Sequence, residues 1–163
     1  MKSKKNKYAP KYNQKKWTRN KYIQRGHNCY SYFLNKIDKN VTNACKKTFK
    51  KYGKCQWPQP GLVKKFKNNS DRATTCKAIY KRIKADNKSI FKTTMKQKCP
   101  KNYYKGALAI NPKKTFHFYR QDKSGYWSHK DGSKKPTRYD KNGKKKRPAR
   151  KNLCPLRAPL HMA

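Results

Sequence analysis

The chain has 163 residues, enough for one domain, and its 47 Lys and Arg against 6 acidic residues give a formal net charge of +41. Charge of this size repels itself in a compact monomer and favours a polyanionic or acidic partner. Only 33% of the residues are hydrophobic, so the core must be small, yet 13% aromatic residues and 6 cysteines exclude a wholly disordered chain.

Membrane and secretion signals are absent from the sequence pattern. No apolar run approaches the roughly 20 residues that span a bilayer, so we expect no transmembrane segment. No apolar stretch follows the basic N-terminus, so we expect no secretory signal peptide. Disulfides in such a chain would need a special oxidising route, because cytosolic thiols stay reduced. Zinc is the minor alternative, since even the nearest cysteines, Cys45 and Cys55, lack the close C-x2-C spacing. We expect no cofactor.

Residues 1–25 form a basic stretch without an acid, interleaved with Tyr8, Tyr12, Trp17 and Tyr22. One interpretation is a solvated, disordered arm. The other is a segment that lies along phosphates or an acidic protein surface, with the aromatic rings as anchors. The candidate basic contacts in this arm are Lys4, Lys5, Lys15, Lys16 and Arg19.

Residues 28–38 predict the first helix. Asn28 is a suitable N-cap, and the apolar residues that follow recur at the spacing of one helix face. Cys29 then lies in the first turn, where the helix dipole and free N–H groups lower a thiol pKa. This is where a cysteine nucleophile would stand, and equally where a buried or disulfide-bonded cysteine can stand.

Residues 40–69 predict a loop that includes the tight turn Gln59-Pro60-Gly61. A second helix is predicted over 71–86, with an apolar stripe that includes Cys76. The sequence SIFKTTM that follows predicts a short strand or a turn. Cys76 and Cys99 both flank predicted core elements, so a bridge between them is possible, although the sequence does not fix the pairing.

A meander of three antiparallel strands is predicted near 106–110, 115–120 and 125–130. TFHFYR alternates, which places Phe116 and Phe118 on one face and His117 and Tyr119 on the other, and QDKSG forms the following turn. The meander therefore presents two imidazoles, those of His117 and His129. The predicted fold is α+β, a small antiparallel sheet packed on two helices, with long basic extended arms. The expected divisions are an N-terminal arm (1–25), a core (26–132) and a C-terminal arm (133–163).

The C-terminal arm is again strongly basic. It reads as a solvated tail or a nuclear-localisation-like run. Cys154 and the apolar ending LCPLRAPL argue instead that it packs back or docks on a neighbour. The candidate basic contacts here are Lys144, Lys145, Lys146, Arg147 and Arg150.

HNCY, QPG and FHFYRQDKSGYWSHKDG together resemble small basic virion proteins, the minor capsid proteins of large algal double-stranded DNA viruses, over about residues 26–140. The order of these parts is also similar to that of NlpC- and CHAP-type papain-like cysteine hydrolases. The second resemblance implies acyl transfer, with Cys29 as nucleophile, His117 as general base and His129 orienting the imidazole. The chain departs from the hydrolase pattern after QPG, where lysines interrupt the expected apolar strand.

The first resemblance implies a place on the inner side of a capsid shell, in a virion assembled in the host cytoplasm with virus-encoded thiol oxidation. The implied partners are the major capsid protein, other minor capsid proteins, and viral DNA or an anionic membrane surface. Three functions follow: a structural virion protein, which the charge favours; a cysteine hydrolase; and a protein that condenses nucleic acid without sequence specificity.

Overall fold

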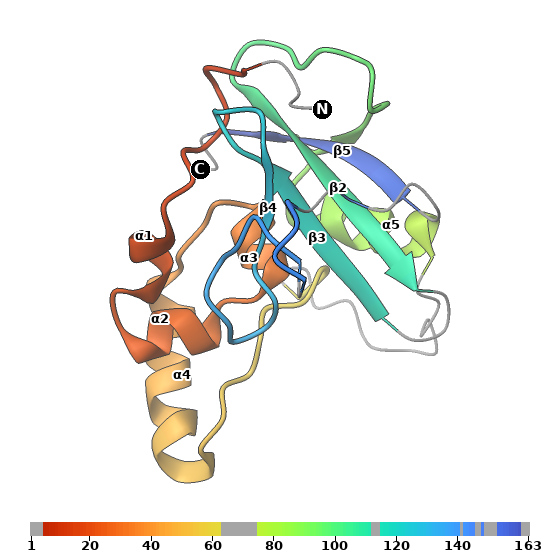
Figure 1. The fold of residues 1–163 in the computed structure, drawn as a ribbon. Coiled ribbons are helices and arrows are strands. Elements are labelled where there is room, and N and C mark those ends of the chain that lie inside the picture. Colours follow the sequence, from red (N-terminus) through yellow and green to blue (C-terminus); the bar gives the residue numbers. More distant parts are fainter. Residues whose placement is uncertain are drawn as a thin grey trace.

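The computed structural model describes residues 5–62, 75–111, 115–140, 142–145, 148 and 153–160. These residues form five helices and one open, five-stranded antiparallel sheet, which confirms the predicted α+β class. The helices are α1 (Gln14–Thr18), α2 (Lys21–Gly26), α3 (Cys29–Phe33), α4 (Lys39–Tyr52) and α5 (Cys76–Asp86). The strands are β1 (Phe91–Lys92), β2 (Tyr103–Asn111), β3 (Thr115–Gln121), β4 (Trp127–His129) and β5 (Leu153–Pro159) (Figure 1).

The sheet has the strand order β1-β5-β2-β3-β4. Strands β2, β3 and β4 are the predicted meander, and β2 pairs with β3 from Gly106 opposite Arg120 to Asn111 opposite Thr115. The alternation of β3 buries Phe118 in the main core, as predicted. The short strand predicted in SIFKTTM is β1.

The C-terminal stretch differs from the expected extended arm, because it contains β5. This strand lies inside the sheet, paired with β1 on one side and with β2 on the other. Cys154, Leu156 and Ala158 alternate into the core. Pro155 and Pro159 conceal the strand in the sequence, since proline normally argues against a strand with neighbours on both sides. The expectation that the apolar ending packs back is confirmed.

The N-terminal stretch also differs from an extended arm, because it folds into α1 and α2. The side chains of Asn13 and Asn20 cap the two helices, each accepting hydrogen bonds from backbone N–H groups of the first turn. Trp17 is 1% exposed, and its ring packs 5.0 Å from that of Tyr32. The aromatic residues expected to anchor this segment to a partner therefore include one that anchors it to the protein itself.

Helix α3 begins after Asn28, as predicted, but ends at Phe33. Asn35 follows in the left-handed conformation (φ 54°), and its side chain accepts a hydrogen bond from the Arg120 guanidinium at 2.9 Å. Because this tertiary contact holds Asn35 outside the helix, the helix cannot extend to residue 38 as its apolar spacing predicts.

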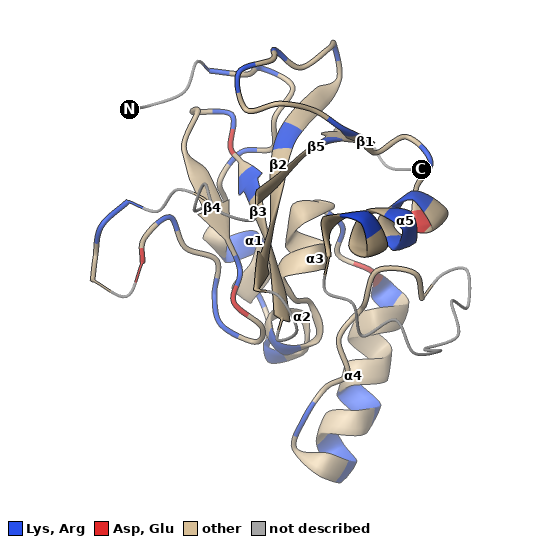
Figure 2. Cartoon of the chain, turned by 90° about the vertical axis from the view of Figure 1, so that its right-hand side faces the viewer, with Lys and Arg blue, Asp and Glu red and all other residues tan. Residues whose placement is uncertain are grey.

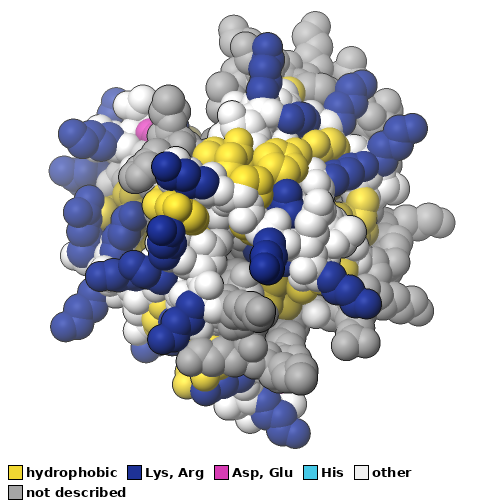
Figure 3. All heavy atoms as spheres, turned by 90° about the horizontal axis from the view of Figure 1, so that it is seen from above, with side chains coloured by type: hydrophobic (Ala, Val, Ile, Leu, Met, Phe, Trp, Pro, Cys, Tyr) yellow, Lys and Arg dark blue, Asp and Glu magenta, His cyan; other side chains and the backbone are white. Residues whose placement is uncertain are grey.

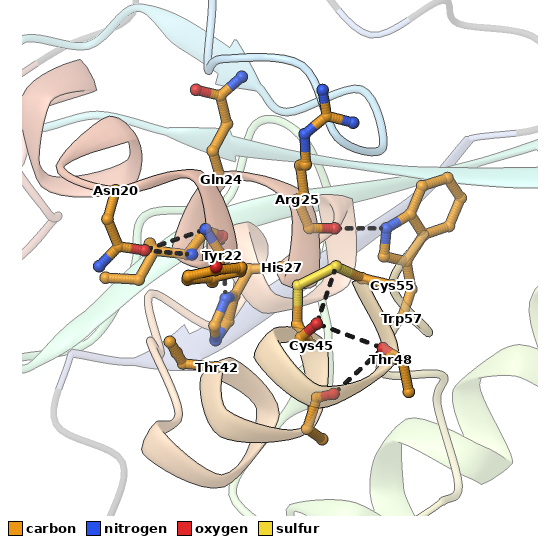
Figure 4. Close-up of a disulfide and its surroundings, with 12 residues drawn as sticks. Asn20, Tyr22, Gln24, Arg25, His27, Thr42, Cys45, Thr48, Cys55 and Trp57 are labelled. Carbon is orange, nitrogen blue, oxygen red and sulfur yellow. Dashed lines mark hydrogen bonds between the residues drawn. A yellow bond between two sulfur atoms is a disulfide. The ribbon is translucent and has the colours of Figure 1, made fainter. Parts of the chain in front are cut away.

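Helix α4 occupies part of the predicted loop. Asp38 caps it by accepting from two backbone N–H groups, and it ends at Gly53 in the left-handed conformation. Cys45 is its buried residue, so it lacks the broad apolar stripe that would reveal it in the sequence. The Cys45–Cys55 disulfide folds the following loop back onto the helix, and the Trp57 indole donates to the Arg25 carbonyl at 2.8 Å (Figure 4).

The main core lies between the sheet and the helices α3 and α5. Ile79 and Ile83 of α5 are fully buried, which confirms its predicted apolar face. A second disulfide, Cys76–Cys154, joins α5 to β5, so Cys76 does bridge helix and sheet as considered, but its partner is Cys154 and not Cys99. Cys99 is a free thiol at intermediate exposure.

Gly106→Ala is expected to lower the free energy of unfolding by about 1–3 kcal/mol, the usual cost of overpacking a core. An added Cβ would meet two ring carbons of Phe33 at 2.1 and 2.6 Å. Urea denaturation measures the loss. Phe33→Leu makes room for the new methyl group, so the double variant should lose less than the sum of the two single losses. Strict additivity, or an unchanged unfolding midpoint for Gly106→Ala, would contradict this packing.

Candidate functional site

The two predicted imidazoles meet on the sheet. His117 Nε2 and His129 Nδ1 are 2.9 Å apart, and the ring centroids are 5.0 Å apart. The pairing of β3 with β4 sets this contact, because Tyr119 lies opposite His129 and His117 is two residues away on the same face. The Tyr119 ring packs against both imidazoles, with centroids 4.9 and 5.2 Å away.

An acidic side chain stands near this imidazole pair. Burial acts to raise the pKa of Asp131, but a hydrogen bond from Lys134 and the charges of Lys134, His117 and His129 outweigh it, so the pKa is lowered. The carboxylate–ammonium distance to Lys134 is 3.1 Å, and both side chains are largely exposed. A carboxylate near the imidazoles is therefore ionised at neutral pH.

Cys29 holds the predicted position at the start of α3, but its environment is not that of a nucleophile. The side chain is 7% exposed and belongs to the main core. Burial raises the pKa of its thiol to about 11, although backbone hydrogen bonds from Phe118, Tyr30 and Cys29 itself act in the opposite direction. Backbone N–H groups near the helix start thus act to lower the thiol pKa, as predicted, but the loss of hydration on burial raises it by more.

Lys130, the residue after His129 at the end of β4, is buried and connects two parts of the chain. Its ammonium group donates to the carbonyl oxygens of Gln24 at 2.5 Å and Gly132 at 2.6 Å, and burial lowers its pKa to about 8. The contact joins α2 to the segment after β4. Two of the cavities in the described part of the protein have volumes of about 430 and 590 Å³, and Cys29, His117 and His129 line neither of these two. Among the described residues, the two imidazoles form a hydrogen-bonded patch on the sheet, and the Cys29 thiol is buried in the core.

The described part of the chain contains neither a cluster of metal ligands nor a membrane-spanning helix. No three His, Cys, Asp or Glu side chains there lie close enough together to hold a metal ion. None of the described helices is both long and apolar enough to cross a bilayer.

The basic candidates of the two ends lie on the surface where they are described. Lys5, Lys15, Lys16, Arg19, Lys144 and Lys145 are exposed, and Lys4, Lys146, Arg147 and Arg150 lie outside the described residues. Lys and Arg also line α4, α5 and the loops, whereas acidic residues are few (Figure 2). The positive charge therefore spreads well beyond the two predicted arms.

The aspartates offset little of this charge because the chain has only 6 acidic residues against 47 Lys and Arg, and each described one also has a partner within the chain. Asp122 is buried beside Arg120 and Arg138. Asp38 and Asp140 accept from backbone N–H groups, Asp86 accepts from the Tyr30 hydroxyl and the Gly61 N–H, and Asp131 pairs with Lys134. A partner of this protein consequently meets lysine side chains with few competing carboxylates.

Comparison with known proteins finds no matching family model, no matching curated protein and no matching solved structure. The likeness to minor capsid proteins and to NlpC- and CHAP-type hydrolases therefore stands on the motifs alone.

Cys29 is expected to react with a maleimide at pH 8 about two orders of magnitude more slowly than an ordinary exposed thiol, because a pKa near 11 leaves little thiolate. Peptide mass spectrometry after timed alkylation measures the rate, and a free cysteine peptide serves as the reference, because burial also raises the pKa of Cys99. In urea both thiols should react at similar rates. Selective and fast labelling of Cys29 in the folded protein would instead support catalysis.

Proposed function

We propose that this protein is a structural component of a virion, a minor capsid protein of a large DNA virus. It binds capsid subunits through its cationic surface, and the genome or an anionic membrane is a further partner. One observation carries the proposal: lysines cover the surface while the described aspartates are engaged within the fold. A surface of this kind needs an acidic or polyanionic neighbour to be stable at high local concentration.

Helix α4 is the element best suited to reach such a neighbour. It projects away from the sheet, and Cys45 is its buried residue (Figure 1). The Cys45–Cys55 disulfide ties the middle of this helix to the loop that follows it. Its exposed lysines are Lys39, Lys46, Lys47, Lys50 and Lys51.

The hydrolase reading of Cys29, His117 and His129 has weaker support. A nucleophile needs thiolate at neutral pH, and the Cys29 pKa is raised to about 11. We propose that the three residues serve the fold instead, Cys29 by packing in the core and the two histidines by their mutual hydrogen bond.

Localisation in intact particles tests the proposal. Purified virions of a virus that encodes this chain should contain it at a fixed ratio to the major capsid protein, measured by quantitative mass spectrometry. Carbodiimide cross-linking of intact particles, which couples lysine amines to activated carboxylates as amides, should join Lys46 or Lys50 to acidic residues of capsid subunits. Absence from washed particles, or cross-links confined within the chain itself, would overturn it.

A further inference from the structure

A cleft of about 590 Å³ lies at one end of the sheet, where two distant parts of the chain face each other. Residues 5–8 form one wall and residues 95–99, from the segment between β1 and β2, form the other. Both segments lie at the top of the protein as drawn in Figure 1. From above, apolar side chains run through the middle of this face with lysine and arginine side chains around them (Figure 3). Sequence analysis did not single out the second wall.

Hydrogen bonds to the sheet hold both walls in place. Asn6 donates from its side chain to the Tyr103 carbonyl at 2.9 Å and from its backbone to the Lys123 carbonyl at 3.3 Å. On the other wall, the Lys105 ammonium donates to the carbonyls of Met95 and Gln97, each at 2.7 Å. Lys105 is 8% exposed, so its ammonium group binds these carbonyls and holds the wall in shape, and it is not presented to solvent. The cleft is therefore formed before any ligand arrives.

The rim of the cleft is cationic on both sides. Lys5 and Lys7 stand on one wall and Lys96 and Lys98 on the other, all four exposed, and none of the described lining residues is acidic. The smaller cavity differs, because Asp38 and Asp86 line it. The rim of this cleft is thus more cationic than that of the smaller cavity, and it favours a ligand with several spaced negative charges.

The interior adds apolar surface to this charge. Tyr8, Met95 and Trp127 line it, and Met95 is 40% exposed. Anionic groups spaced along a chain that also carries flat apolar rings match this combination, as in single-stranded nucleic acid. The volume suits a drug-sized molecule, so it admits a nucleotide or two of a single strand and not a duplex.

We propose that this cleft binds a short segment of single-stranded nucleic acid, with phosphates against the lysines of both walls and a base against Tyr8 and Met95. The inference goes beyond the proposed function, because a cleft that excludes a duplex takes a single strand and not the double-stranded genome itself. Binding here is without sequence specificity, because the lysines contact only the backbone.

Cys99 makes the test specific, because it lines the cleft and is a partly exposed free thiol. An oligothymidylate of about eight nucleotides, near saturation, should slow alkylation of Cys99 about tenfold. Lys96→Gln/Lys98→Gln should weaken binding about tenfold and reduce the slope of log affinity against log salt by about 1.4, the value for two lost contacts to a single strand. Lys77→Gln/Lys81→Gln on α5 removes the same charge elsewhere and should leave both readouts within twofold.

Three further results separate the alternatives. Tyr8→Ala, or Met95→Ala if the first variant unfolds at a lower temperature, should weaken oligothymidylate binding and leave inorganic polyphosphate binding unchanged. Protection of Cys99 by polyphosphate or polyaspartate equal to that by oligothymidylate would overturn the proposal. Equal weakening by the two lysine pairs would also overturn it, while leaving a general structural role by charge intact. Absence from virions would sink the proposed function without altering these binding results.

Discussion

Asp122→Ala is expected to lower the free energy of unfolding by about 3–5 kcal/mol, the cost of breaking a buried ion pair from one side. Asp122 and Arg120 are both fully buried, with 3.8 Å between carboxylate and guanidinium. The carboxylate also accepts from the Ser128 hydroxyl at 2.8 Å and from Arg138 at 3.0 Å. Without it, the Arg120 charge stays in the interior without its counterion.

The network matters because it joins the first half of the chain to the sheet. The Ser128 hydroxyl also bonds the Tyr32 hydroxyl at 2.7 Å, and Arg120 lies 3.9 Å over the Tyr32 ring while donating to the Tyr32 carbonyl. Burial raises the Asp122 pKa, although Arg120, Ser128 and Arg138 lower it. A buried ion pair of this kind need not make the protein more stable than apolar residues in its place would. The large loss of stability in Asp122→Ala arises because only one partner of the pair is removed.

A surface aspartate supplies the control for this variant. Asp131→Ala removes the same charge and breaks the pair with Lys134, in which both side chains are more than half exposed. Exposed pairs of this kind contribute up to about 1 kcal/mol, so the loss should be small. Guanidinium denaturation of both variants gives the comparison. Equal losses would mean that Asp122 acts only through net charge.

The sequence predicts the meander well because its signals are local. Alternation in TFHFYR and the turn before Trp127 define β3 and β4, and adjacency of the strands brings His117 and His129 together. No local sequence pattern predicts the burial of Cys29. Its burial depends on Phe118 of β3 and on the rest of the core, which lie far from it in the sequence.

Elements stabilised by distant contacts account for the rest of what was missed. Helix α4 depends on an Asp38 cap and a disulfide more than on an apolar face, and β5 forms because β1 and β2 provide edges for it. The basic cleft escapes sequence analysis for the same reason. Its two walls are about ninety residues apart in the chain, and each wall alone looks like one more lysine-rich loop.

Removal of the Cys76–Cys154 disulfide is expected to cost about 4–5 kcal/mol, against about 3 kcal/mol for Cys45–Cys55, if loop entropy in the unfolded chain dominates. The first bridge closes a loop with a sequence separation of 78 and the second one of 10. The long bridge also ties α5 to the strand that completes the middle of the sheet. Denaturation of Cys76→Ala/Cys154→Ala and Cys45→Ala/Cys55→Ala, compared at equal m-values, measures both costs.

The positions of the two disulfides in the fold predict that their removal loosens different elements. Without the long bridge, β5 keeps only its strand pairing and core contacts, so hydrogen exchange should rise in β1 and β5 before it rises in β3. Without the short bridge, exchange should rise in α4 alone, because Cys45 is the buried residue of that helix. Cys99→Ala removes a cysteine outside both bridges and should leave the exchange pattern unchanged. A larger loss from the short bridge would show that loop entropy does not set the ranking and that α4 supports the fold more than its exposure suggests.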